Sequence, residues 1–275
     1  RRVLFRSKII YSEVKNFALK ANLNILQPEK IKNNEAFLSE LRKINPDFIF
    51  VAAYGKILTN DILNIPKFGC INVHSSLLPK YRGAAPINWS IINGDKDTGV
   101  TIMEMDEGMD TGNIILSKKI AIAESDNITS LTEKLASCGC DAIGEFVQKC
   151  LKTRSIDSKP QDNSPASIAP KIDKEKCKID WSEKSFDILN LIRGSNPWPG
   201  ATTTLFKNKI TIWEAKNAGP ALAKPGSIKK IEKKMFVSCK DNEIEIIKIQ
   251  KSGKNVMDGK NFINGIIIDE ETCFN

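Results

Sequence analysis

Histidine is almost absent from this chain, which has only one in 275 residues, and this scarcity limits the metal chemistry that the chain can support. A histidine-rich zinc site is excluded, and the seven cysteines form no C-x-x-C pair of the kind that zinc sites use. The odd number of cysteines argues against a disulfide framework and favours reduced, mostly buried thiols. Cys138 and Cys140 are close in sequence, but helical spacing points them to different faces, so we expect no metal.

Long apolar segments and several common enzyme motifs are also absent. No stretch approaches the run of about 20 apolar residues that a membrane-spanning helix needs, and no signal peptide is visible, so we expect a cytoplasmic protein with no membrane partner. The sequence contains no G-x-S-x-G elbow, no Walker A loop and no G-x-G-x-x-G fingerprint. Serine hydrolases, P-loop NTPases and the usual dinucleotide-binding enzymes therefore lose support.

The overall composition is that of a globular protein, with 41% hydrophobic and 27% charged residues, and the length suits two domains. The net charge of +8 is concentrated in one part of the chain. Residues 151–275 hold 22 Lys and Arg against 16 Asp and Glu, or +6, whereas residues 1–150 hold 19 against 17, or +2. A basic C-terminal part favours an anionic partner such as nucleic acid, although a lysine-rich solvated surface explains the charge equally well.

Helical and strand patterns alternate in the first part of the chain, which predicts an α/β domain with a mostly parallel sheet over residues 1–154. Apolar runs at 48–53 and 69–74 are typical of strands buried on both faces. The other expected elements are helices at 11–22, 34–44, 86–94 and from 126 or 127 to 152, a short helix capped by Thr59, and strands at 98–105 and 113–123.

The second part of the chain has a different character. Residues 155–170 are polar and rich in proline, so we predict a linker there, followed by a C-terminal domain over 171–275. We expect one helix from Trp181 to Gly194 and short strands at 201–206, 210–215, 236–239 and 244–250. Several short strands in such a small domain favour a β-barrel.

The single histidine, His74, stands at the end of a predicted strand, and Asn72 precedes it by two positions. Side chains two apart on a strand share a face, and ligands bind beyond the carboxyl ends of such strands. The two side chains could then donate hydrogen bonds to an oxygen that becomes negative during attack on a carbonyl. A lone histidine is, however, more often a structural residue than a catalytic one.

An acidic turn at 106–112 could complete such a site. It carries three carboxylates and two glycines, and Asp110 is the best candidate to reach His74, orient its ring and favour its protonated form. The alternative is an ordinary solvated acidic loop between two strands.

Taken together, these motifs resemble those of the folate-dependent formyltransferases. The resemblance rests on NVHSSLLPKYRGAAPI at 72–87 and DEGMDTG at 106–112. Within that group, KIDWS at 178–182 and IRGSNPWPG at 192–200 resemble the branch that acts on methionyl-tRNA. The resemblance implies a Rossmann-like domain followed by a small OB-like barrel that helps to hold tRNA.

The resemblance also implies roles for individual residues. Asn72, His74 and Asp110 would be catalytic, and Arg82, Lys207 and Lys209 would contact tRNA, although a surface cation is the simpler explanation for Arg82. YGKIL at 54–58 matches a segment that lines the folate pocket in the family, although such a loop could also only pack on a helix. The full set implied for the folate is Ile57, Leu58, Ser75, Leu77, Leu78, Pro79, Glu107 and Gly108.

The reaction implied is direct formyl transfer from 10-formyltetrahydrofolate to the free amine of initiator methionyl-tRNA, by a monomer without a metal. A sugar-nucleotide N-formyltransferase and a catalytically inactive RNA-binding remnant are the alternatives. The family begins with a strand, a helix, a second strand and a basic loop, whereas the match here starts near Lys8. We therefore expect a chain that is incomplete at its N-terminus, with residues 1–7 foreign to the family.

Overall fold

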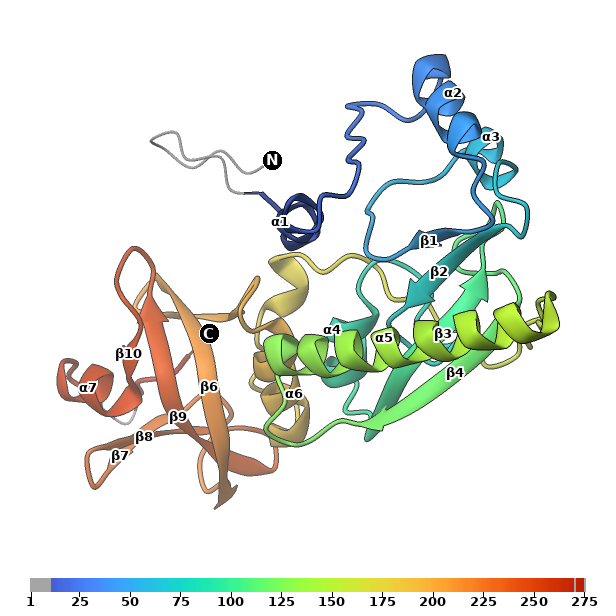
Figure 1. Ribbon diagram of the computed structural model, residues 1–275. Coiled ribbons are helices and arrows are strands. Elements are labelled where there is room, and N and C mark those ends of the chain that lie inside the picture. Colours follow the sequence, from blue (N-terminus) through green and yellow to red (C-terminus); the bar gives the residue numbers. More distant parts are fainter. Residues whose placement is uncertain (1–10, 270, 275) are drawn as a thin grey trace.

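The computed structural model describes residues 11–269 and 271–274, so that residues 1–7, which the sequence analysis sets apart, lie outside the described residues. Two lobes lie side by side in Figure 1, an α/β domain and a domain built mainly of strands, with helix α6 between them. The α/β fold class with a second, β-rich domain is therefore as expected.

The N-terminal domain, residues 11–154, holds a four-stranded sheet with the order β1-β2-β3-β4. Only β1 and β2 are parallel, so the expected mostly parallel sheet is mixed within the described residues. The short connection from β3 to β4 permits only antiparallel pairing of those two strands. The chain between β2 and β3 contains α4 and returns so that β3 also runs antiparallel to β2. The elements are α1 (Glu13–Lys20), α2 (Glu35–Ile44), β1 (Ile49–Val51), α3 (Asn60–Leu63), β2 (Cys70–His74), α4 (Pro86–Ile92), β3 (Asp97–Glu104), β4 (Ile114–Ala121) and α5 (Ile128–Thr153).

The long helix α5 crosses one face of this sheet (Figure 1) and forms the core of the domain with it. Leu131, Leu135 and Phe146 of α5 pack with the inward residues Ile71 and Val73 of β2. Because side chains alternate along a strand, Asn72 and His74 point to the opposite face. Packing against α5 thus places the two polar residues together on the other side of the sheet.

The ends of α5 follow from local chemistry. Asn127 accepts a hydrogen bond from the backbone N–H of Ser130, and the Ser130 hydroxyl accepts one from the N–H of Asn127, which makes a capping box. The helix ends at Arg154, whose backbone is left-handed. Thr59 stands at the start of α3 as expected, but its side chain makes no capping hydrogen bond.

The C-terminal domain, from residue 171 onward, is a six-stranded antiparallel sheet with the order β5-β6-β9-β8-β7, and β10 pairs with β9. Its interior is filled by buried residues that are mostly aliphatic, eighteen of them among the residues that the structure describes. The elements are a 3₁₀ turn (Glu175–Cys177), α6 (Ser185–Ser195), β5 (Ala201–Leu205), β6 (Asn208–Pro220), β7 (Ile228–Ile231), β8 (Lys234–Ser238), β9 (Asn242–Lys251), β10 (Met257–Asp258) and α7 (Gly259–Asn264).

The gap between the outer strands β5 and β7 is covered by two segments that are far apart in sequence. Lys178 bridges to Thr202 of β5, and Cys273 bridges to Ser227 next to β7. The Trp181 ring stacks on Phe274, with ring centroids 5.2 Å apart and planes within 8°. The curved sheet is thus closed by side-chain stacking and two isolated bridges instead of a continuous strand ladder.

Trp181 does not open a helix, as the sequence pattern predicts; α6 begins at Ser185 instead. The Asp180 carboxylate accepts hydrogen bonds from the N–H and the hydroxyl of Ser182, which forms a turn that competes with helix formation. The indole N–H of Trp181 donates to the Thr203 hydroxyl at 2.9 Å. Trp181 therefore serves the core of the C-terminal domain.

The two domains touch through a close crossing of α4 and α6. The Asn88 side chain of α4 donates to the carbonyl of Gly194 in α6 at 3.0 Å. Arg193 of α6 donates to the carbonyls of Ala123 and Asp126, which lie between β4 and α5. The closeness of the backbones depends on Gly194, because a Cβ there would lie 2.6 Å from Cγ1 of Ile92.

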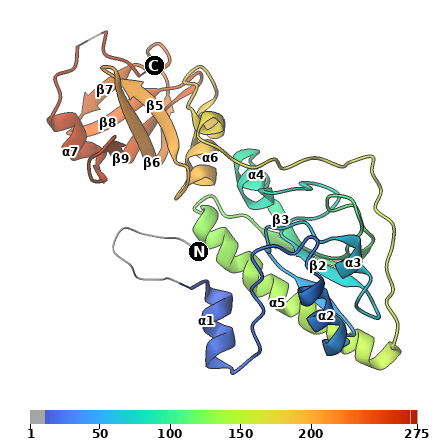
Figure 2. The same ribbon diagram turned by 90° about the horizontal axis from the view of Figure 1, so that it is seen from above.

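Residues 155–170, which we call the strap, connect the two domains but do not hang free. The strap runs from the far end of α5 back along the N-terminal domain to α6 (Figure 2). Lys159 pairs with Ile114 of β4, and Ile168 pairs with Arg82. The backbone N–H groups of Arg82 and Ala85 donate to carbonyls of Ser167 and Ala169. The backbone of the strap thus pairs with backbone groups of the N-terminal domain.

Candidate active site

The candidate site begins at the end of β2, where His74 is buried with 5% of its surface exposed. Its Nε2 lies 2.9 Å from the backbone carbonyl of Tyr81. A carbonyl oxygen only accepts hydrogen bonds, so Nε2 carries the proton in this pairing. The other ring nitrogen, Nδ1, faces the Asp110 carboxylate, with 3.6 Å between Nδ1 and Oδ2.

Asp110 reaches this point from the turn between β3 and β4. Its Oδ2 accepts from the backbone N–H of Gly83 at 2.8 Å, and its Oδ1 accepts from the Asn72 side-chain amide at 3.3 Å. Its backbone is left-handed, with φ of 55°, a region that aspartate tolerates better than most residues. The predicted grouping of Asn72, His74 and Asp110 is thus present in the structure.

The side chains of Asn72, Asp110 and His74 form a short row of neighbouring polar groups. Asn72 has a second N–H that makes no hydrogen bond within the part of the chain that the structure describes. A carbonyl oxygen placed between this N–H and Nδ1 of His74 would meet one donor, and a second one when the ring also carries a proton on Nδ1, with a carboxylate beside them to take a proton. Such a set is suited to acyl transfer to an amine.

The loop that follows β2 is fixed by a second set of hydrogen bonds. Thr101 of β3 accepts from the backbone N–H of Leu78, and its hydroxyl donates to the carbonyl of Ser76. The Ser76 hydroxyl in turn donates to the carbonyl of Lys80. Since the carbonyl of Tyr81 comes next in the same loop, these bonds keep the partner of His74 in place.

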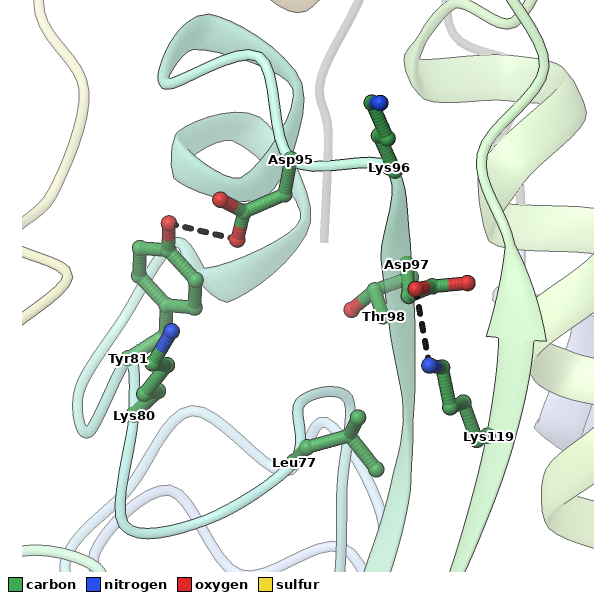
Figure 3. A pocket seen from close by; sticks show the side chains of 8 residues that line it. All are labelled: Leu77, Lys80, Tyr81, Asp95, Lys96, Asp97, Thr98 and Lys119. Carbon is green, nitrogen blue, oxygen red and sulfur yellow. Dashed lines mark hydrogen bonds and ion pairs between the residues drawn. The ribbon is translucent and has the colours of Figure 1, made fainter. Parts of the chain in front are cut away.

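A pocket of about 300 Å³ is lined in part by Leu77, Lys80 and Tyr81 of this loop (Figure 3). The Tyr81 hydroxyl donates to Asp95 at 2.7 Å, and Asp97 pairs with Lys119 at 2.8 Å. Burial, together with the Asp95 carboxylate, raises the pKa of Tyr81 to about 12, so its hydroxyl remains a donor at physiological pH. The ring of Tyr81 thus anchors the loop whose carbonyl holds His74.

Within residues 11–269 and 271–274, no group of three or more His, Cys, Asp or Glu side chains is arranged to hold a metal ion. None of the helices in the same residues has both the length and the apolar character that crossing a membrane requires.

Comparison with known proteins decides the family. Residues 7–147 match the family model described as formyl transferase, and residues 171–266 match the formyl transferase C-terminal domain. The methionyl-tRNA formyltransferase of Caldanaerobacter subterraneus subsp. tengcongensis is 46% identical over 266 residues, which cover 96% of this chain and 86% of that protein. The enzyme of the same name from Bacillus subtilis is 40% identical and covers 93% and 81%.

The chain belongs to the methionyl-tRNA formyltransferase family.

Solved structures agree on the fold of this family. The N-formyltransferase from Helicobacter canadensis, in complex with folinic acid and dTDP-3-aminofucose, aligns with a TM-score of 0.67 at 22% identity, covering 88% of this chain and 85% of that one. HypX from Aquifex aeolicus, in complex with tetrahydrofolic acid, aligns with a TM-score of 0.64 at 17% identity, covering 82% of this chain but only 40% of that one. The shared fold is a Rossmann-like domain followed by a sheet domain.

The residues that the family resemblance assigns to the folate fall into two groups in the structure. Ile57 is 91% exposed, and the nearby Asn60 donates to the Glu107 carboxylate at 2.6 Å. The 54–58 segment therefore lies beside the turn that carries Asp110, to which Gly108 also belongs. Leu58 instead packs with a small apolar cluster around Ile62, as the alternative interpretation expects.

The second group of folate residues lies in the loop after β2. Ser75 and Pro79 are half-buried, and Leu78 is buried. Leu77 packs against Gly99 of β3 and lines the pocket of Figure 3. Glu107 and Gly108 thus lie in the turn of Asp110 with the 54–58 segment beside it, whereas Leu77 lines the pocket next to the loop after β2.

The residues assigned to tRNA also differ from one another. Arg82 is 8% exposed and donates to the side chains of Gln161 and Asn163 in the strap, so it is neither a free surface cation nor an open anion contact. Lys207 and Lys209 are exposed and make no ion pair with any described residue. Of the three residues assigned to tRNA, Lys207 and Lys209 could meet a phosphate without rearrangement, and Arg82 could not.

Two parts of the site could not be found in the sequence. One is the backbone carbonyl of Tyr81, which the sequence cannot single out because every residue has a backbone carbonyl. The other is Gln161, which donates to the carbonyls of Asp110 at 2.9 Å and Gly112 at 2.8 Å. Gln161 lies in a segment that looks like a linker, and only the path of the strap reveals its contacts.

Proposed function

We propose that this chain transfers a formyl group from 10-formyltetrahydrofolate to the amino group of methionyl-initiator tRNA, for the initiation of translation. The observation that carries the proposal is the convergence of Asn72, His74 and Asp110 in a chain that is 46% identical to a methionyl-tRNA formyltransferase. The donor supplies the formyl carbon, and the protein's own groups assist the attack of the amine on it.

Asn72 and His74 stabilise the negative charge that develops on the formyl oxygen. The free N–H of Asn72 and the Nδ1–H of a protonated His74 point to the same place beside Asp110. Donors held in advance act mainly on the transition state, because they need not reorganise as charge develops. The Tyr81 carbonyl supports this role by holding the opposite side of the imidazole ring.

Asp110 serves as the proton carrier of the proposed reaction. Its carboxylate lies beside both Asn72 and His74. As the amine nitrogen forms its bond to the formyl carbon, its proton passes to Asp110 and on to the folate nitrogen that leaves. Atoms and charge balance without a metal and without a covalent bond to the protein.

The surroundings support the proposed substrates. Ile57 offers apolar surface to the ring of the folate beside Glu107 and Gly108, and Ser75, Leu78 and Pro79 of the loop after β2 stay part of the proposed pocket. Leu58 and Leu77 pack elsewhere and would reach the folate only after rearrangement. The exposed Lys207 and Lys209 offer positive charge to tRNA phosphates. All three reacting side chains come from one chain, so one chain suffices for the proposed chemistry. We propose that it acts as a monomer, in the cytoplasm where charged tRNA is used. The proposal keeps 1–154 as the catalytic domain, 155–170 as the linker and 171–275 as the tRNA-binding domain.

The test is an acceptor assay with the purified chain and 10-formyltetrahydrofolate. Initiator tRNA charged with methionine is offered in one reaction, and a nucleotide-linked amino sugar in another. Release of formylmethionine after hydrolysis of the tRNA ester is the expected result, with no product from the sugar. Binding of tRNA without any formyl transfer would instead identify an RNA-binding protein and overturn the proposal.

A further inference from the structure

The strap crosses the active site at one residue that contacts both of its loops. The Gln161 side chain donates to the carbonyls of Asp110 and Gly112, in the turn between β3 and β4. Its Oε1 accepts from Nε of Arg82 at 3.1 Å and from Nη2 of Arg82 at 2.6 Å, in the loop after β2. One side chain therefore ties the turn of Asp110 to the loop that holds His74.

These contacts fix the orientation of the Gln161 amide. Reversing the amide would bring its N–H groups against the donors of Arg82 and its oxygen against two carbonyl oxygens. All the N–H groups and the oxygen of the amide are used in the observed orientation. Of the common side chains of this length, glutamine alone can donate twice on one side and accept on the other.

The turn that Gln161 holds is one that needs support. Asp110 has a φ of 55°, in the left-handed region that non-glycine residues adopt at a cost. A Cβ at Gly112 would lie against the carbonyl of Glu104, so this part of the turn is also packed closely on β3. The amide of Gln161 bonds the two carbonyls on either side of Thr111 and so stabilises the backbone that carries the Asp110 carboxylate.

Arg82 is the second partner of Gln161, and it is buried without a carboxylate. Its other contact is the side-chain oxygen of Asn163, and it makes no ion pair with any residue that the structure describes. A glutamate at 161 would be the more obvious partner for a buried guanidinium. It could not donate to the carbonyls of Asp110 and Gly112, which indicates that the glutamine serves the turn of Asp110.

We infer that Gln161 is a positioning residue of formyl transfer, through which the strap between the two domains holds the Asp110 carboxylate against His74 and Asn72. This inference rests on the proposed function for its kinetic consequence. The geometric part of the inference is that the surroundings of His74 depend on Gln161, and this part does not require the proposed function.

The test compares two substitutions with a matched control. Gln161→Glu keeps an acceptor for Arg82 and adds a charge partner, but it removes both donors to the turn. Gln161→Met has a similar length and neither donates nor accepts. The control is Ser158→Ala, which removes another side-chain contact of the strap, to Glu104 at 3.0 Å, without touching Asp110 or Arg82.

The kinetic readout separates positioning from stability. We expect both Gln161 variants to lower kcat by about tenfold to 10²-fold, the scale expected for a catalytic group displaced by about 1 Å, with little change in KM for either substrate. Gln161→Glu should melt higher than Gln161→Met, because its carboxylate keeps a partner for the buried guanidinium, whereas both variants lose the two donors to the turn. A merely structural residue would make activity follow the melting temperature.

A second readout needs no turnover. His74 is the only histidine, so the ring nitrogens of a chain labelled with [15N]histidine, prepared without a histidine tag, give signals from one site. We expect these signals to shift in both Gln161 variants and to remain unchanged in Ser158→Ala. This readout tests the geometry on folded protein even when activity is low.

The outcomes distinguish the inference from the function on which it rests. An active wild type, with Gln161 variants that keep both kcat and the His74 signals, would overturn the inference alone. A wild type that does not formylate methionyl-tRNA would overturn the proposed function, and the His74 signals would then decide whether Gln161 holds the turn. Signals that shift equally in Ser158→Ala would also count against a specific role for Gln161.

Discussion

Asp110 shows how much of the site depends on a single side chain. Its two carboxylate oxygens accept from Gly83 and from Asn72, and one of them also faces His74. Its carbonyl accepts from Gln161. The residue is therefore held through both its backbone and its side chain, so its charge can be changed while its position is kept.

The Asp110→Asn substitution removes the negative charge of the side chain and keeps the residue in the turn. Asparagine tolerates the left-handed backbone as well as aspartate does, and its backbone carbonyl can still accept from Gln161, so the turn should keep its shape. Its oxygen can keep one of the two N–H donors, from Gly83 or from Asn72, and its NH2 group cannot accept from the other. The loss of the charge beside His74, and of the proton acceptor, should lower kcat by about 10²-fold or more with a small change in KM. Steady-state kinetics with methionyl-tRNA measures this. The control is Asp106→Asn in the same turn, and equal losses in the two variants would contradict the special role of Asp110.

Asp126 provides a prediction on pH dependence away from the site. Burial raises the pKa of this carboxyl, but hydrogen bonds from Lys134, the backbone of Ala123 and the hydroxyl of Ser130 outweigh burial and lower it below the usual 3.8. A lowered pKa stabilises the fold above the pKa of the unfolded chain, and this contribution is lost as pH falls through the folded value.

The substitution Asp126→Asn should therefore reduce the free energy of unfolding more at pH 7 than at pH 3. Asparagine keeps an acceptor for the backbone of Ala123 but loses the charge that pairs with Lys134. Urea unfolding of both proteins at the two pH values gives the difference. An equal destabilisation at both would show that the charge of Asp126 contributes nothing.

Residue by residue, the sequence predicted the part of the site that depends on residue type. Asn72 and His74 share a face because a strand alternates, and Asp110 reaches them because turns follow strand ends. Arg82 was expected at an anion or on the surface, whereas the strap covers it. Contacts across 79 residues of sequence, such as Arg82 with Gln161, leave no local pattern to detect.

At the scale of elements, glycine has opposite effects in two helices. A Cβ at Gly194 in α6 would lie 2.6 Å from Cγ1 and 3.2 Å from the backbone nitrogen of Ile92 in α4. A Cβ at Gly144 in α5 would meet nothing within 4 Å. The first glycine allows two helices to approach, and the second has no such use.

We expect Gly194→Ala to destabilise the protein by about 1–3 kcal/mol through overpacking. The matched substitution Gly144→Ala should stabilise it by about 0.5–1 kcal/mol, because alanine loses less backbone entropy in a helix. Thermal unfolding of the two variants beside the wild type measures both effects. Stabilisation by both would mean that the crossing of α4 and α6 adapts freely to an added methyl group.

Elements were predicted well where apolar periodicity is strong and poorly where turns use unusual residues. The strands and helices of the N-terminal domain follow long apolar patterns, and they lie close to their expected positions. The strand β7 was not predicted, because Glu232 and Lys233 make the hairpin turn to β8 with positive φ angles of 49° and 66°. Asn-Gly, the usual signal of such turns, is absent there.

Across the whole molecule, the lysines differ in whether an acidic side chain already pairs with them. Lys207 and Lys209 are exposed and make no ion pair with a described residue. Lys216, on the same strand as Lys209, already pairs with Glu245 at 3.3 Å. A count of charge alone treats these lysines as equal, and the structure separates them.

Reversing the charge of Lys207 and Lys209 together should weaken tRNA binding and make the affinity less dependent on salt, because fewer counterions are released. Lys216→Glu serves as the matched control and should change the salt slope less, since its charge is already balanced. Binding measured over a series of salt concentrations gives both quantities. An unchanged slope in the Lys207 and Lys209 variant would remove these lysines from the tRNA contact.

The closure of the C-terminal sheet by Trp181 and Phe274 bears on the order in which the chain can assemble during its synthesis. Everything that the catalytic site needs, from β2 to the strap, leaves the ribosome before β5 does. The sheet domain, in contrast, cannot cover the gap between β5 and β7 until residues 272–274 have emerged. A nascent chain would therefore carry the candidate site in its α/β domain while the sheet domain still waits for residues 272–274.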